Sequence, residues 1–144
     1  VTRLAQRLEV TGKVAFLDYQ PREVLPLSLA SGDLHYVGLA RGLSGFVVPS
    51  RLYGILAAAR PVLVSADADS ETARLVEEVG CGFVLPPGRP ELVAGVIRDL
   101  EEGRLSLEGM GERGREWVER EADREVAFGR YRSLVADVVA SSSR

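Results

Sequence analysis

The residues best suited to chemistry in this sequence are Ser50 and Arg51, which follow Gly45 and Pro49 at the start of a short helical segment. A serine at this point is a good helix cap, because its hydroxyl can accept a hydrogen bond from a backbone N–H of the first turn. The unpaired N–H groups and the dipole at a helix N-terminus favour an anion, and an arginine in the first turn adds a charged fork that fits a phosphate. The pattern predicts a phosphate or diphosphate site, with an ordinary capped helix as the alternative.

Elements that could position this site alternate along the chain between strands and helices. Short apolar runs that alternate with helical segments predict a parallel α/β sheet with right-handed crossovers. Four such runs are the expected strands: Val14–Leu17, Leu34–Val37, Val62–Val64 and Phe83–Leu85. The expected fold is therefore α/β, with at least four parallel strands flanked by helices.

Helix boundaries follow capping and proline signals. Arg60-Pro61 should end the helix that starts at Ser50, because the residue before a proline is pushed toward extended geometry. Ser70 should cap the next helix, and Asp123 the last one. The expected helices cover about residues 1–10, 22–30, 52–59, 70–79, 90–102, 105–120 and 123–140.

A second polar group, Asp18-Tyr19-Gln20, follows the first expected strand. Ligands in open α/β sheets bind beyond the carboxyl ends of the strands, so these residues should share a cleft with Ser50. A plain polar loop remains the alternative.

Structural roles are expected for the other side chains that could bind a metal ion or react. His35 is the only histidine and stands inside an expected strand, which predicts a buried, hydrogen-bonded side chain. Asp67 and Asp69 could hold Mg²⁺, but capping and solvent contact are the favoured reading. Cys81 stands between two glycines and is expected to be a small buried side chain. No metal site is predicted.

Composition limits the classes of protein that this sequence can represent. A chain of 144 residues that is 46% hydrophobic has the size and apolar content of one globular domain. Its net charge of −3 argues against a nucleic-acid partner. The single cysteine excludes an internal disulfide and favours a cytoplasmic setting. No apolar run is long enough to span a bilayer.

Several stretches together resemble bacterial retaining glycosyltransferases of the GT-B fold, in the subgroup that builds exopolysaccharide and lipopolysaccharide sugars. Residues 49–62 resemble the family signature PSK-x-Y-x-x-LAAGRPV. Further agreement lies at residues 14–23, 31–35, 69–74 and 80–88. The pieces occur in the family's order and cover most of residues 10–100.

This resemblance implies that residues 1–144 are a single Rossmann-like, nucleotide-sugar-binding domain from a larger chain. The first strands of that domain and the whole acceptor domain would then be missing. The parent would be a hexosyltransferase that moves a sugar from a nucleoside-diphosphate donor to a glycan or lipid-linked acceptor, without a cofactor. The fragment alone is expected to be inactive. The resemblance implies a cytoplasmic enzyme and leaves open a peripheral association with the inner membrane surface.

The same resemblance assigns the donor to particular residues and leaves the catalytic residue unassigned. Base recognition falls mainly on the backbone of residues 18–20, and diphosphate binding on Ser50 and Arg51. Two glutamates of the family are replaced by Phe46 and Gly54, which keeps a non-catalytic nucleotide-sugar-binding or docking module as the alternative. Ala59 stands where the family usually has glycine. The donor-binding set is Asp18, Tyr19, Gln20, Gly45, Ser50, Arg51, Tyr53 and Gly54.

Overall fold

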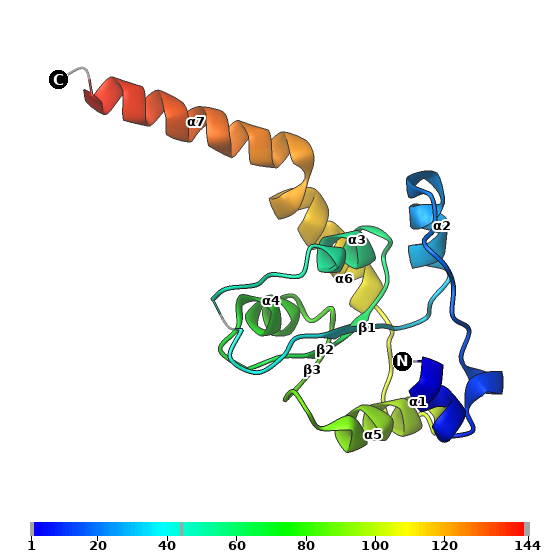
Figure 1. Cartoon of the computed structure of the whole chain (residues 1–144). Helices are drawn as coiled ribbons and strands as arrows, with labels where there is room; N and C mark the ends of the chain where they lie inside the picture. The colour runs from blue at the N-terminus through cyan, green and yellow to red at the C-terminus, as the bar shows by residue number, and fades with distance from the viewer. Residues whose placement is uncertain (1, 44, 143–144) are drawn as a thin grey trace.

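A computed structural model of the chain describes residues 2–43 and 45–142 and shows an α/β fold with one parallel sheet (Figure 1). The sheet contains β1 (His35–Gly38), β2 (Val62–Ser65) and β3 (Gly82–Leu85), in the order β1-β2-β3. The predicted strands at 34–37, 62–64 and 83–85 are confirmed within one residue.

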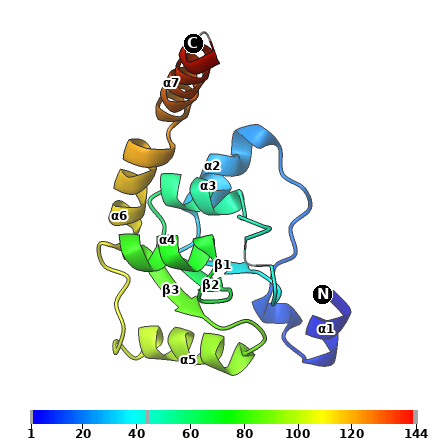
Figure 2. The same cartoon turned by 90° about the vertical axis from the view of Figure 1, so that its left-hand side faces the viewer.

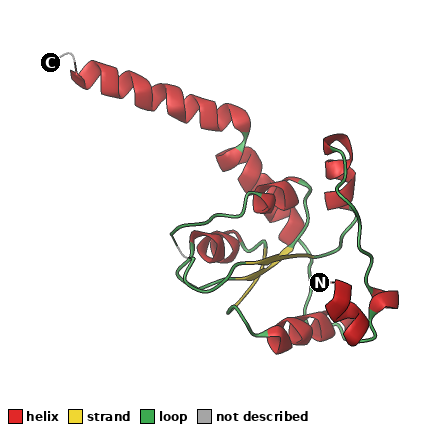
Figure 3. Cartoon of the chain, in the orientation of Figure 1, coloured by secondary structure: helices red, strands yellow, loops and turns green. Residues whose placement is uncertain are grey.

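Helices surround this small sheet (Figure 3). The helices α3, α4 and α6 cover one face of the sheet, and α5 lies on the opposite side (Figures 1 and 2). The helices are α1 (Thr2–Arg7), α2 (Leu25–Ala30), α3 (Arg51–Ala57), α4 (Glu71–Val79), α5 (Pro90–Glu101), α6 (Met110–Trp117) and α7 (Arg124–Ser142), with the short turns η1 (Thr11–Lys13), η2 (Arg22–Val24) and η3 (Val118–Ala122). None of the described helices is long and apolar enough to cross a membrane.

The core lies between the sheet and the layer of α3, α4 and α6. Val37 pairs with Val64, and Val64 with Val84, so one valine from each strand faces this layer. Leu52, Ile55, Leu56 and Val76 pack against them from the helices and are at most 1% exposed. Complete burial of such a side chain stabilises the fold by about 1.5–3 kcal/mol, so this layer holds α3 in place.

The predicted strand at 14–17 is wrong, and the described sheet has three strands where at least four were expected. Residues 14–20 form an extended segment in which every residue is exposed. Phe16 and Leu17 are 46% and 77% exposed. An apolar run becomes a strand only when a neighbouring strand pairs with its backbone, and no described strand lies beside this segment.

The last helix, α7, extends away from the body of the molecule (Figures 1 and 2). Asp123 precedes its first residue and caps it as predicted, since the Asp123 carboxylate accepts a hydrogen bond from the N–H of Glu125 at 2.9 Å. Its main contact is with η3. Large apolar side chains along α7 are exposed, at Phe128, Tyr131, Leu134, Val135, Val138 and Val139.

Candidate functional site

The first turn of α3 differs from the expected capped start. Ser50 has helical backbone angles, φ −57° and ψ −27°, and its side chain makes no capping hydrogen bond, so the prediction of a serine cap is wrong. A backbone bond from Leu52 N–H to the carbonyl of Pro49, 2.9 Å long, closes this turn instead. The helix therefore does not use the hydroxyl of Ser50, which leaves that group available to a ligand.

Three of the eight predicted site residues lie together. Ser50, Arg51 and Gly54 line an open cavity of about 550 Å³ between α2 and α3. Pro49, Leu25 and Leu29 complete its lining. Ser50 and Arg51 are exposed, so a polar pair stands at the edge of an otherwise apolar hollow. The volume falls in the range of about 300–1,000 Å³ that is typical of small-molecule sites.

Gly54 lies where α3 packs against α2. A Cβ atom added at Gly54 would lie 3.1 Å from Cδ1 of Leu29. The resemblance places one of the family's two glutamates at this position, and a side chain of that size would require Leu29 to move. The resemblance places the other glutamate at Phe46, which is 84% exposed. The packing of Leu29 therefore limits the room for a side chain at Gly54.

Tyr53 lies apart from the Ser50 cavity. Its ring stacks on Trp117, with 6.2 Å between centroids and 29° between planes. The two rings line another cavity, of about 430 Å³, with Val48 and residues of α4. Because neighbouring helix residues point about 100° apart, Tyr53 and Gly54 face different sides of α3. Tyr53 therefore joins α3 to α6 in this structure.

Asp18, Tyr19 and Gln20 are exposed, and none of them lines the Ser50 cavity. Tyr19 is 95% exposed, and the Gln20 amide donates to the carbonyl of Asp18 at 3.0 Å. The expectation that a strand would place them at the carboxyl edge fails with the strand at 14–17. Gly45 has a positive φ of 79° in the loop before α3 and also lies outside the lining of that cavity.

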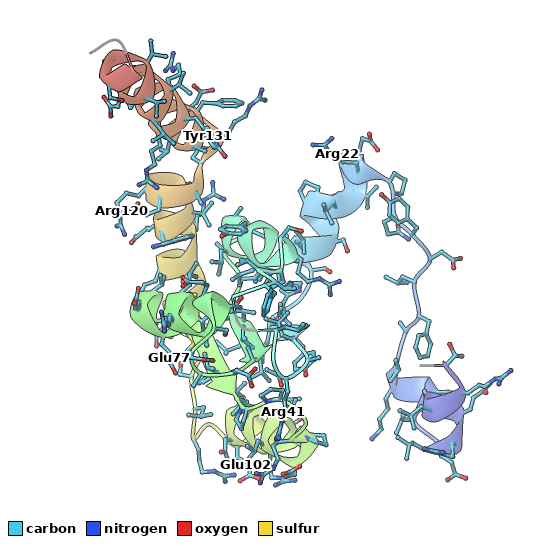
Figure 4. All side chains as sticks on the ribbon, turned by 60° about the vertical axis from the view of Figure 1, so that its left-hand side comes forward. Arg22, Arg41, Glu77, Glu102, Arg120 and Tyr131 are labelled. Atoms are coloured by element: carbon cyan, nitrogen blue, oxygen red, sulfur yellow. The ribbon has the colours of Figure 1, made fainter. Side chains whose placement is uncertain are left out.

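Two residues that the sequence did not assign to the site hold the loop before α3. The carboxylate of Asp67 accepts a hydrogen bond from Gly42 N–H at 2.8 Å. The guanidinium of Arg41, labelled in Figure 4, donates to the carbonyl of Pro87 at 3.2 and 3.3 Å. These bonds join three loops that follow the three strands. Sequence patterns could not reveal these contacts, because the partners lie 25 and 46 residues apart in the chain.

The remaining polar candidates have structural roles. Ser70 caps α4 as predicted, since its hydroxyl accepts from Ala73 N–H at 3.1 Å. Nε2 of His35 lies 2.8 Å from the carbonyl of Leu29, which confirms the expected hydrogen bond, although the ring is only partly buried. Cys81 is fully buried, and burial raises the pKa of its thiol to about 11. Within residues 2–43 and 45–142, no cluster of three acidic, histidine or cysteine side chains could hold a metal ion.

Comparison with known proteins places these features in context. The chain is 28% identical over 114 residues to "Probable glycosyltransferase WbjE" of Pseudomonas aeruginosa. It is 32% identical over 111 residues to "Putative colanic acid biosynthesis glycosyl transferase WcaI" of Escherichia coli K12. The chain is a relative of bacterial glycosyltransferases.

These matches confirm the resemblance that the motifs indicated, and they also define its extent. They cover 79% and 76% of this chain but 28% and 26% of the two relatives. The chain thus spans about a quarter of the length of each glycosyltransferase that it matches. No protein-family model matches the chain, and no solved structure gives a significant match.

Proposed function

We propose that this chain is the donor-binding part of a glycosyltransferase that moves a sugar from a nucleoside-diphosphate donor to a glycan or lipid-linked acceptor during cell-surface polysaccharide synthesis. The observation that carries the proposal is the similarity to two glycosyltransferases, one of them named for colanic acid biosynthesis. The signature-like residues 49–62 support it, because they form α3 and the start of β2 beside the Ser50 cavity.

In this proposal the donor diphosphate lies at the start of α3. The N–H groups of the first turn and the Ser50 hydroxyl donate hydrogen bonds to phosphate oxygens, and the Arg51 guanidinium supplies a positive charge. The same groups stabilise the diphosphate as negative charge develops on it during sugar transfer. This part of the enzyme therefore positions the donor and stabilises its diphosphate electrostatically. The reaction as proposed uses no cofactor, and no nucleic acid takes part in it.

The isolated chain should bind the donor weakly and transfer no sugar. Its cavity is open, so water is not excluded, and Gly54 and Phe46 offer no side-chain acceptor to ribose hydroxyls. The acceptor would bind to the remainder of the enzyme. We place that enzyme in the cytoplasm, where it can meet nucleotide sugars and associate peripherally with the membrane that carries lipid-linked acceptors.

Titration with UDP and with GDP, followed by NMR or calorimetry, tests this site. Arg51→Ala should weaken any binding by about five- to tenfold, because it removes a charge-assisted contact of about 1–1.5 kcal/mol. High salt should weaken binding by the unchanged chain, since the contact is exposed and electrostatic. Arg98→Ala, which removes an exposed arginine from α5, is the matched control and should have no effect. Binding that is insensitive to Arg51→Ala would contradict the assigned site.

A non-catalytic nucleotide-sugar-binding or docking module is the second candidate. The contact between Gly54 and Leu29 favours it, because the space of a donor-binding glutamate is used for packing. Sugar transfer by the full-length protein distinguishes the two candidates. Loss of transfer in full-length Arg51→Ala, with the fold intact, would support the enzyme; a full-length protein that binds UDP or GDP without transferring a sugar would support the module.

A further inference from the structure

The helical layer of α3, α4 and α6 carries two open cavities that adjoin each other. One is the cavity of about 430 Å³ that Tyr53 and Trp117 line, and the other, of about 350 Å³, lies between α4 and α6. Trp117 and Glu78 line both, so the cavities meet at these two side chains. We call the pair of cavities the α4 groove, because α4 lines it from Glu71 to Val79, a length of about 12 Å in an α-helix.

Aromatic side chains form the apolar part of the α4 groove. Trp117 and Tyr53 stack on each other and are half-buried, and Trp117 also packs against the core. This packing holds the two rings in place. Within residues 2–43 and 45–142, neither the Trp117 indole N–H nor the Tyr53 hydroxyl has a hydrogen-bond partner. Fixed rings with free polar groups suit a ligand that is apolar on one face and polar around its rim.

Charged side chains line the rest of the groove, with as many carboxylates as guanidiniums. All of them are exposed. They are the carboxylates of Glu71, Glu78 and Glu116 and the guanidiniums of Arg74, Arg113 and Arg120. The lining therefore has no net charge, and it offers both acceptors and donors of hydrogen bonds. Such a balance favours a neutral ligand over a strongly charged one, because the potentials of the two signs offset each other.

Several of these charged groups remain available to a ligand. The side chains of Glu78 and Glu116 form no ion pair or hydrogen bond with any described residue. The guanidinium of Arg74 approaches Glu71 only to 3.8 Å, which is too long for a hydrogen bond. Arg120, labelled in Figure 4, lies on the π-helical turn η3 directly after Trp117. Turns of this kind occur frequently at functional sites.

We propose that the α4 groove binds a segment of neutral oligosaccharide. A sugar ring has an apolar C–H face that fits the rings of Trp117 and Tyr53. Its hydroxyls can donate to carboxylates and accept from guanidiniums, so Glu78 and Glu116 accept hydrogen bonds from the sugar while Arg74 donates to it. The choice of a glycan rests on the proposed function, in which the parent enzyme handles glycan chains.

The α4 groove is separate from the proposed donor site. Tyr53 and Gly54 face different sides of α3, so this helix lies between the groove and the Ser50 cavity. The two sites have no lining residue in common. The groove therefore holds part of a glycan chain away from the donor, and an oligosaccharide should bind whether or not a nucleotide is present.

Trp117 is the only tryptophan, so its fluorescence and its single indole N–H signal in NMR report on the groove. Titration of the chain with maltotriose, cellotriose and triacetylchitotriose should change both signals saturably for at least one of these sugars, with a dissociation constant of about 1–10 mM. Glu78→Ala should weaken this binding by about three- to tenfold, because it removes an exposed hydrogen bond to a charged group. Glu77→Ala is the matched control, since this neighbour on α4, labelled in Figure 4, is exposed and lines neither cavity.

Excess UDP separates this inference from the donor site, because it should leave trisaccharide binding unchanged. A chain that binds a trisaccharide but neither UDP nor GDP would retain the groove and lose the donor site. Three results would overturn the inference. The first is no saturable change of the Trp117 signals with any of the three sugars. The second is equal affinity of Glu78→Ala and Glu77→Ala for the sugar. The third is displacement of the sugar by UDP, which would place it in the Ser50 cavity.

Discussion

At the scale of single residues, the backbone just after α3 is strained, as the alanine at position 59 of the sequence already indicated. Ala59 has a positive φ of 53°, which disfavours any residue with a Cβ by about 1–2 kcal/mol. The family usually has glycine at this position. The strained alanine persists because the core residues on either side, in α3 and β2, fix the turn between them.

Cys81 gives a residue-scale prediction. Its thiol is buried, and loss of solvation raises its pKa from 9.0 to about 11. The native protein should therefore react with a thiol reagent at pH 8 at least about 100-fold more slowly than the urea-unfolded protein. Ser133→Cys in a Cys81→Ala background places a thiol on the exposed surface of α7 and serves as the fast-reacting reference.

The pH dependence follows from the same shift. A raised folded-state pKa means that the neutral thiol is favoured in the native protein, so stability is unaffected below pH 9. Stability should fall as the pH rises from 9.0 through about 11, because the unfolded chain releases the proton first. A Cys81→Ala variant should lack this part of the alkaline loss in urea titrations. Equal alkaline loss in both proteins would show that the thiol is not its cause.

At the scale of elements, the close contact between α6 and α3 shows why a helix rich in glycine can still be well ordered. A Cβ added at Gly111 would lie 2.1 Å from the carbonyl oxygen of Ala59, and one at Gly114 would lie 2.8 Å from Leu56 Cδ2. Both glycines are buried. The small residues that reduce helix propensity therefore allow α6 to pack directly on α3.

Gly111→Ala should consequently destabilise the protein by more than about 2 kcal/mol, because its new methyl group would meet a backbone carbonyl and the helix would have to move. Gly95→Ala in α5 is the matched control, since nothing lies within 4 Å of the added Cβ. This control should be neutral or stabilise by up to about 1 kcal/mol. Urea unfolding followed by circular dichroism measures both, and similar stabilities for the two variants would argue against the contact.

At the scale of the whole molecule, packing is distributed unevenly along the chain. Residues 35–118 contain the sheet and nearly all of the buried core, whereas residues 2–28 and 124–141 are mostly exposed. The two outer parts carry large apolar side chains that remain largely exposed, among them Leu17, Leu27 and Leu134. The central part should therefore account for most of the free energy of unfolding of the isolated chain. The outer parts present apolar surfaces against which other structure can pack.

Removal of α7 tests this distribution. Ending the chain at Asp123 should change the free energy of unfolding by less than about 1 kcal/mol, because α7 contacts the body mainly through η3 and buries little surface. Trp117 remains in the shortened chain and reports unfolding by fluorescence. Leu56→Ala, which empties a fully buried position, should cost about 2–5 kcal/mol in the same assay. A large loss on removal of α7 would show that it packs on the body in solution.

Sequence patterns alone determined the elements whose stability depends on near neighbours. The three strands that pair with one another were predicted within one residue, because short apolar runs that alternate with helical segments mark the strands of a parallel sheet. The Ser70 cap of α4 and the start of α7 at Asp123 were also predicted, since each uses a hydrogen bond within three residues. The relationship to glycosyltransferases likewise came from local motifs at residues 49–62.

Tertiary structure decided the features that depend on distant partners. Residues 14–17 have the pattern of a strand, but a strand needs a neighbour's backbone groups, and none of the described strands supplies them. Ser50 has the residue type of a cap, yet its backbone angles are set by the turn at Pro49. Tyr53 and Gly54 are adjacent in sequence but face Trp117 and Leu29 on different helices. The sequence therefore specified the local elements, while long-range packing selected which of the candidate residues share a site.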